Sequence, residues 1–117
     1  MKRKLETNKP AGQTTPTCWQ REAPSACLRV EPTGAEAHLF PYQQLISAAL
    51  IHADGTETLT LTFASHEIAC SGRNLRELFH AVQDFAVKWM RPMPERYHAT
   101  FAGNCGLIAT IRITPAA

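Results

Sequence analysis

An Asp-Gly pair at positions 54 and 55 separates two strand-like runs and constrains the fold more than any other feature of the sequence. The first run is the largely apolar LISAALIH at 45–52, and the second is TETLTLTF at 56–63. Aspartate and glycine both tolerate the positive φ angles of a tight two-residue turn. The sequence therefore predicts a β-hairpin. Its second strand should pack Leu59, Leu61 and Phe63 on one face and leave the alternating threonines facing water or a neighbour.

Two further strands are expected before this hairpin. Apolar and polar residues alternate from Ala26, with Leu28 and Val30 on one face, until a Pro-Thr-Gly sequence at 32–34 ends the pattern. Another strand is expected over 35–40, and it breaks near Pro41, which has no backbone N–H to donate.

The segment ASHEIACSGRNL, residues 64–75, is the densest set of reactive side chains in the sequence. On a helix, His66 and Cys70 would share one face, a pattern close to the H-E-x-x-H zinc motif. However, Phe63 closes a strand, and Gly72 comes just after Cys70. The segment EIACS is therefore interpreted as a returning strand. There, His66 and Cys70 are separated by roughly 13 Å, at about 3.3 Å per residue, which is too far for both to bind one ion. We therefore expect a turn histidine, an inward-facing Ile68 and Cys70, and no metal site.

A long amphipathic helix is expected over about 74–91. Asn74 is the predicted N-cap and Glu77 its capping-box partner, and apolar residues recur at helical spacing until Pro92 ends the helix. Such a stripe is wide enough to cover one face of a sheet. The opposite face carries polar groups at i,i+4 spacing with one exposed apolar residue among them: Arg76, His80, Asp84 and Lys88, with Val87.

One or two strands are expected after the helix. YHATF at 97–101 is a candidate strand and AGNCG at 102–106 a turn. LIATIRIT at 107–114 alternates cleanly, which predicts a strand with Leu107, Ala109, Ile111 and Ile113 on one face. The predicted fold class is therefore α+β, an antiparallel meander sheet packed by one long amphipathic helix.

Composition and charge limit the function classes. The 117 residues carry 12 Lys and Arg against 10 Asp and Glu, and the excess lies at the two ends of the sequence. Residues 1–17 and 69–117 are basic, whereas 18–68 is acidic, a bipolar pattern that argues against nucleic-acid capture as the main role. Four cysteines without C-x-x-C spacing favour reduced structural thiols.

The proline- and threonine-rich segment 1–17 is expected to be a disordered tail, and 18–117 a single globular domain. The sequence contains no apolar run of bilayer length and no secretory signal pattern, so the expected location is cytoplasmic, with no membrane partner.

Three functional hypotheses follow. The preferred one is a non-catalytic interaction or self-associating module, because unpaired sheet edges and an exposed threonine face favour pairing with another chain. The first alternative is anion or nucleic-acid binding through the basic C-terminal half. The second is a small enzyme that uses His80 with Asp84 or a cysteine thiolate.

No residue is assigned as catalytic, and no cofactor or metal is expected. The candidate binding residues come from the polar helix face and from the basic half of the sequence: Arg73, Arg76, His80, Asp84, Val87, Arg96 and Arg112.

Overall fold

The computed structural model describes residues 17–98 and 106–116. The predicted tail over 1–17 lies almost entirely outside these residues. So do most of the candidate strand over 97–101 and most of the predicted turn over 102–106.

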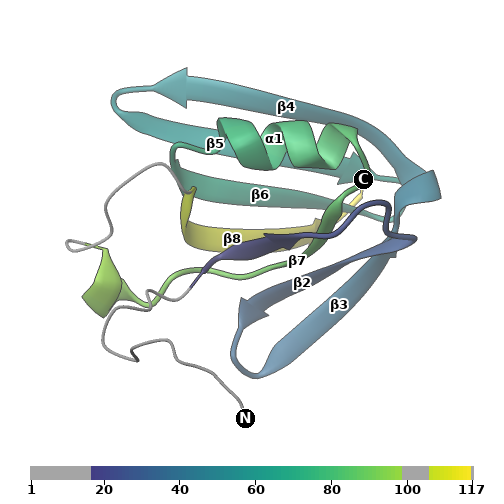
Figure 1. Ribbon diagram of the computed structural model, residues 1–117, viewed down its shortest axis with the longest axis horizontal. Coiled ribbons are helices and arrows are strands. Elements are labelled where there is room, and N and C mark those ends of the chain that lie inside the picture. The colour runs from purple at the N-terminus through teal and green to yellow at the C-terminus, as the bar shows by residue number, and fades with distance from the viewer. Residues whose placement is uncertain (1–16, 99–105, 117) are drawn as a thin grey trace, which may run out of the picture.

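The protein has an α+β fold dominated by strands, but the strands form two sheets instead of the single expected one (Figure 1). The first sheet has the order β1 (Trp19–Arg21), β7 (Val87–Met90), β2 (Cys27–Thr33) and β3 (Glu36–Pro41). The second sheet has the order β4 (Leu45–Ala53), β5 (Thr56–Phe63), β6 (His66–Arg73) and β8 (Leu107–Pro115). Within the described residues every pairing is antiparallel except that of β2 with β7, which is parallel. The remaining elements are α1 (Arg76–Gln83) and two short 3-10 helices, η2 (Tyr42–Gln44) and η3 (Glu95–Tyr97).

The hairpin predicted at the Asp-Gly pair is confirmed. Asp54 has φ 55° and Gly55 has φ 77°, and Ala53 pairs with Thr56 across the turn. The expected packed face of β5 is also confirmed, because Leu59, Leu61 and Phe63 are buried. Together β4, β5 and β6 form the consecutive antiparallel strands that the sequence predicts.

The segment HEIAC is extended, as expected, and forms the first part of β6. Ile68 and Cys70 are fully buried. His66 differs from the prediction in detail, since it is the first residue of the strand and not a turn residue. Its ring packs edge-on against Phe40, with 5.6 Å between centroids.

The helix is much shorter than predicted. It spans Arg76–Gln83, whereas the sequence pattern predicted about 74–91. The chain leaves the helix through a Schellman motif, in which the N–H of Ala86 donates to the carbonyl of Ala81 and that of Phe85 to the carbonyl of Val82. Phe85 takes the left-handed conformation at φ 55°, a position that glycine or asparagine usually occupies. Because position 85 holds neither glycine nor asparagine, the sequence gave no signal that the helix ends there.

The residues after Phe85 leave the helix and form strand β7, which lies between two other strands of the first sheet. Val87 and Met90 are completely buried, and β7 pairs with both β1 and β2. Val87 was predicted to be exposed on the helix, and this prediction is wrong. The apolar residues that were predicted to form one face of the helix are thus divided between α1 and β7. Pairing of β7 with β1 and β2 outweighs the helical spacing of these residues.

The predicted helix cap is also wrong. Asn74 is in the left-handed region at φ 57°, and Leu75 occupies the N-cap position. The backbone N–H of Leu75 donates to Oε1 of Glu57 at 2.7 Å. The carboxylate that accepts this backbone N–H therefore comes from Glu57 on strand β5, while Glu77 lies in the first turn of the helix.

Strand β8 follows the predicted alternation only in its second half. The register shifts opposite Ser71 and Gly72, so Ile108 as well as Leu107 is buried, while Ala109 is only half-buried. Gly72 permits this close pairing, because a Cβ atom there would lie 1.8 Å from the carbonyl oxygen of Leu107.

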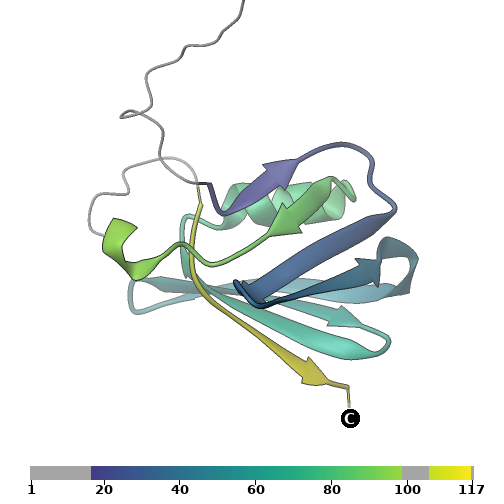
Figure 2. The same cartoon turned by 90° about the horizontal axis from the view of Figure 1, so that it is seen from below.

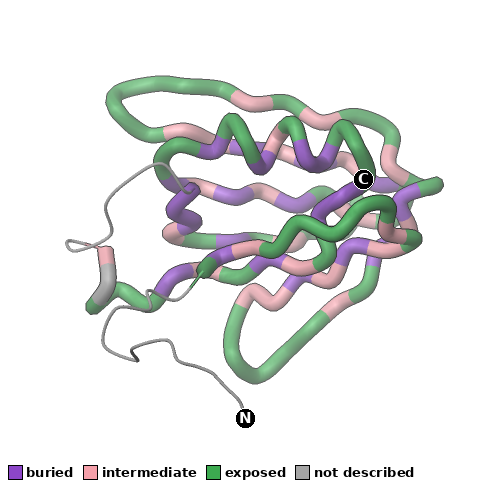
Figure 3. The backbone as a smooth tube through the Cα atoms, in the orientation of Figure 1, coloured by how far each residue is buried: buried purple, intermediate pink, exposed green. Residues whose placement is uncertain are grey.

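The core lies between the inner faces of the two sheets and α1 (Figures 1 and 2). The helix covers the part of the second sheet nearest β4, and the first sheet covers the remainder. Strand β4 therefore lies at an outer edge of the molecule, where most of its trace is exposed (Figure 3).

Candidate functional site

The predicted His80 and Asp84 pair does not form, because α1 ends before Asp84. The Asp84 carboxylate instead accepts a hydrogen bond from Nη2 of Arg21 at 2.6 Å, and the His80 ring lies beside that of Phe79. Lys88, the last member of the predicted polar face, lies on β7 and donates to Glu22 at 3.0 Å. The first pair joins β1 to the end of α1, the second joins β7 to the residue after β1, and neither orients an imidazole for base catalysis.

The four candidate arginines lie on four different elements. Arg73 ends β6 and donates to the carbonyl oxygen of His98 at 3.1 Å, and Arg96 is in η3. Arg112 is opposite Ala69 on the outer face of the second sheet, whereas α1, which begins at Arg76, packs on the inner face. Arg76 and Arg112 therefore lie on opposite sides of this sheet, an arrangement that favours no common anion site.

The described residues contain no cluster of three or more metal-binding side chains. Cys18, Cys27 and Cys70 are not joined in disulfides. Burial raises the pKa of the Cys70 thiol to about 12, so this thiol stays protonated at neutral pH. Its neighbour is the sulfur of Met90, 4.0 Å away.

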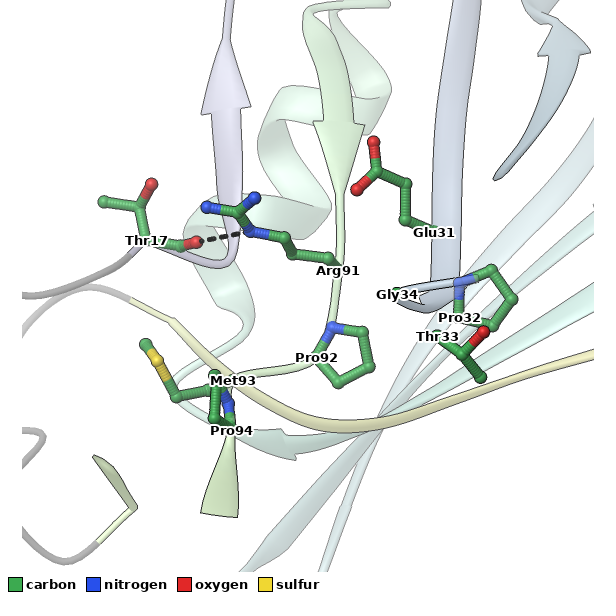
Figure 4. A pocket seen from close by; sticks show the side chains of 9 residues that line it. All are labelled: Thr17, Glu31, Pro32, Thr33, Gly34, Arg91, Pro92, Met93 and Pro94. Atoms are coloured by element: carbon green, nitrogen blue, oxygen red, sulfur yellow. Dashed lines mark hydrogen bonds between the residues drawn. The ribbon is translucent and has the colours of Figure 1, made fainter. Parts of the chain in front are cut away.

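An open cleft of about 450 Å³ lies between the turn that joins β2 to β3 and the segment that follows β7 (Figure 4). Prolines form much of its wall, and Glu31 and Arg91 supply its charged groups. Both charges already have partners, since Glu31 accepts from Arg29 at 2.8 Å and Arg91 donates to the carbonyl oxygen of Thr17 at 3.3 Å. The lining favours no particular ligand, since its acidic group already has an ion-pair partner and its one guanidinium is bonded at Nε.

Strand β4 presents a free edge with little of the usual protection against pairing. Within the described part of the chain, β4 pairs with β5 and with no other strand. Sheet edges of natural proteins are commonly protected by charged side chains, proline, short length or bulges. Strand β4 spans nine residues and contains no Asp, Glu, Lys, Arg or Pro. A bulge at Ile46 is the protection that it carries.

Two large apolar side chains of β4 also face solvent. Ile46 is 68% exposed and Ile51 is 59% exposed. Only two other large apolar residues in the described chain are exposed, Leu39 on β3 and Phe85. The exposed apolar groups therefore concentrate at and beside the β4 edge.

An apolar groove of about 220 Å³ runs along this edge, between β4 and α1. Leu45 and Ala48 form its β4 wall, and Phe79 and Phe85 line the helix side. The Phe85 ring is fixed against Tyr42, with 5.1 Å between centroids. An unpaired strand edge beside an apolar groove is the arrangement that proteins use to add a further strand.

The sequence predicted unpaired edges and exposed surface in general but did not identify Ile46, Ile51 or Phe85. One signal was available, because residues 42–53 contain no Asp, Glu, Lys or Arg and carry apolar side chains at both odd and even positions. The groove had no signal in the sequence, since it depends on where the helix ends.

Comparison with known proteins supplies no relative, because no family model, curated protein or solved structure matches the chain. At eight residues, α1 is too short to cross a bilayer, and no other helix among the described residues has the length and apolar character to do so.

Proposed function

We propose that this protein is a non-catalytic module that self-associates through the edge of β4. The observation that carries the proposal is the nine-residue free edge without a formal charge, together with the exposed Ile46 and Ile51. Pairing with another strand satisfies the backbone groups of the edge and removes apolar surface from water. A homodimer with closed twofold symmetry is the commonest way for identical chains to achieve this.

The absence of charge on β4 favours a second copy as its partner. Self-pairing brings two identical strands together, so a charged residue near the symmetry axis would face its own like charge. Strand β4 carries no such residue, and its one ionisable side chain is His52.

The residues considered for catalysis, Cys70 and His80, also lack the features that a catalytic role requires. Burial holds the Cys70 thiol neutral, and the carboxylate of Asp84, which was expected to orient His80, pairs with Arg21 instead. A single strand pair buries less than the roughly 1,200 Å² of a standard stable interface, so we expect concentration-dependent association.

The test is the solution mass measured by light scattering from micromolar to near-millimolar protein. The wild type should shift from the mass of one chain to that of two as the concentration rises. A double variant, Ile46→Lys with Ile51→Lys, places charges on the edge and should remain monomeric throughout.

A matched control carries the same charge change on the other sheet. Ala37→Lys with Leu39→Lys alters two exposed positions of β3, and Leu39 has an exposure of 67%, nearly equal to that of Ile46. This variant should associate as the wild type does. A wild type that stays monomeric at every concentration, or a β4 double variant that still dimerises fully, would contradict the proposal.

A further inference from the structure

The β-hairpin determines which backbone groups of β4 are available to a partner. In a two-residue hairpin the residues that flank the turn, here Ala53 and Thr56, form a hydrogen-bonded pair. Hydrogen-bonded and non-hydrogen-bonded pairs then alternate along the ladder. It follows that Ile51 and Ala49 bond to β5, whereas the backbone N–H and C=O groups of Ala48, Leu50 and His52 point away from β5.

This alternation restricts the ways in which a second copy can pair. In an antiparallel ladder, outward-facing residues must lie opposite outward-facing residues. A twofold axis must therefore pass through one residue of β4, and the central choices are Ala49, Leu50 and Ile51.

The bulge at Ile46 selects among these choices. It leaves Ser47–Ala53 as the regular part of β4, and Leu50 is the centre of that segment. An axis at Leu50 pairs Leu50 with its symmetry mate and Ala48 with His52, so every outward amide of the segment has a partner. An axis at Ala49 places His52 opposite the bulge, and an axis at Ile51 places Ala48 opposite the turn.

Side-chain size agrees with the axis at Leu50. On the outer face, Ile51 then lies opposite the small Ala49 of the partner subunit, and no two bulky β-branched residues meet. On the inner face, the two Leu50 side chains meet each other at the axis. His52 of the partner subunit then lies opposite the small Ala48; within each chain, Nδ1 of His52 lies 3.5 Å from Oε2 of Glu57.

We infer that two copies of this chain join antiparallel through β4 with the twofold axis at Leu50, and that the second sheets of the two copies become one continuous sheet. The inference rests on the proposed self-association and specifies its register.

Cysteine cross-linking distinguishes the registers. In the proposed arrangement Ala49 and the partner's Ile51 form a non-hydrogen-bonded pair, whose Cα atoms are about 4.5 Å apart and within disulfide range. An Ala49→Cys protein mixed with an Ile51→Cys protein should form a covalent heterodimer under mild oxidation. Each variant alone should cross-link poorly, since its own cysteines lie about two residues out of register. Cys27→Ser and Cys105→Ser are included in both proteins to remove competing thiols.

Each outcome has a defined meaning. Efficient cross-linking of Ala49→Cys alone would place the axis at Ala49, and that of Ile51→Cys alone would place it at Ile51. Either result overturns the inferred register and leaves self-association intact. Light scattering of both proteins under reducing conditions then distinguishes a wrong register from a lack of self-association. A dimer that forms without any of these cross-links refutes the register, whereas a monomer refutes the proposed function itself.

Discussion

The hydroxyl of Tyr42 joins the start of the second sheet to β7, and its removal should destabilise the protein substantially. Tyr42 is 3% exposed, donates to the carbonyl oxygen of Val87 at 2.7 Å and accepts from the Val87 N–H at 3.1 Å. A Tyr42→Phe variant leaves both backbone groups buried without these bonds. Each buried polar group that loses its partner costs about 1–3 kcal/mol, so for the two groups we expect a loss of about 2–6 kcal/mol in the free energy of unfolding.

The same residue should make stability depend on alkaline pH. Burial raises the pKa of Tyr42 to about 12, compared with 10.0 for an ordinary tyrosine. Above pH 10 the unfolded chain releases this proton while the folded protein retains it, so the unfolded state is favoured as the pH rises. The advantage of the wild type over Tyr42→Phe should be complete below pH 10 and should shrink by about 3 kcal/mol as the pH approaches 12.

The assay is urea unfolding of wild type and variant at low protein concentration, followed by tryptophan fluorescence, with the slope of the transition compared as well as its midpoint. Thr60→Val removes a hydroxyl from the outer face of β5 and should change stability by less than about 0.5 kcal/mol. A Tyr42→Phe variant as stable as this control, or one whose deficit grows above pH 10, would refute the reasoning.

Three further predictions concern the fold. Gly72→Ala should lower the free energy of unfolding by about 3 kcal/mol, because the new Cβ collides with the Leu107 carbonyl. Gly34→Ala meets no atom within 4 Å and should be nearly neutral, so equal effects of the two variants in urea unfolding would contradict this. Phe85→Gly should be more stable than Phe85→Ala by about 1 kcal/mol, since both remove the ring but only glycine adopts the left-handed conformation without cost, and the reverse order would be inconsistent with the Schellman motif. The native Cys70 thiol should resist a thiol reagent at pH 8 while the half-buried Cys27 reacts, as peptide mapping would show; rapid native labelling of Cys70 would mean that β6 opens readily.

Local chemistry made the hairpin and β5 predictable. The turn at Asp54 needs only residues that accept positive φ, and the alternation of Leu59 and Leu61 with threonine reflects a single packed face. The strand that contains Cys70 was also predictable from local residues, because the strand that ends at Phe63 precedes it and Gly72 lies near its end.

The end of the helix was not predictable, because it depends on contacts between distant parts of the sequence. Phe85 takes a conformation that is costly for a bulky residue, by about 1–2 kcal/mol, and its ring packs on Tyr42. Val87 and Met90 then gain complete burial between strands that lie far away along the chain. A helical pattern of apolar residues contains no information about such partners.

The candidate site was predictable only in outline. Unpaired edges are expected in any open sheet, but the sequence does not tell which strand occupies the edge. The order of the second sheet places β4 there, and only then do the missing charges of this strand and the exposed Ile51 become significant.

The most direct measurement of β4 pairing is residue-resolved amide hydrogen exchange as a function of protein concentration. The amides of Ala48 and Leu50 point away from β5, whereas those of Ala49 and Ile51 bond to it and serve as internal controls. The account predicts that exchange at Ala48 and Leu50 is fast in dilute protein and slows as the concentration rises, while the two controls stay protected throughout. Fast exchange at Ala48 and Leu50 at every concentration would contradict pairing at this edge.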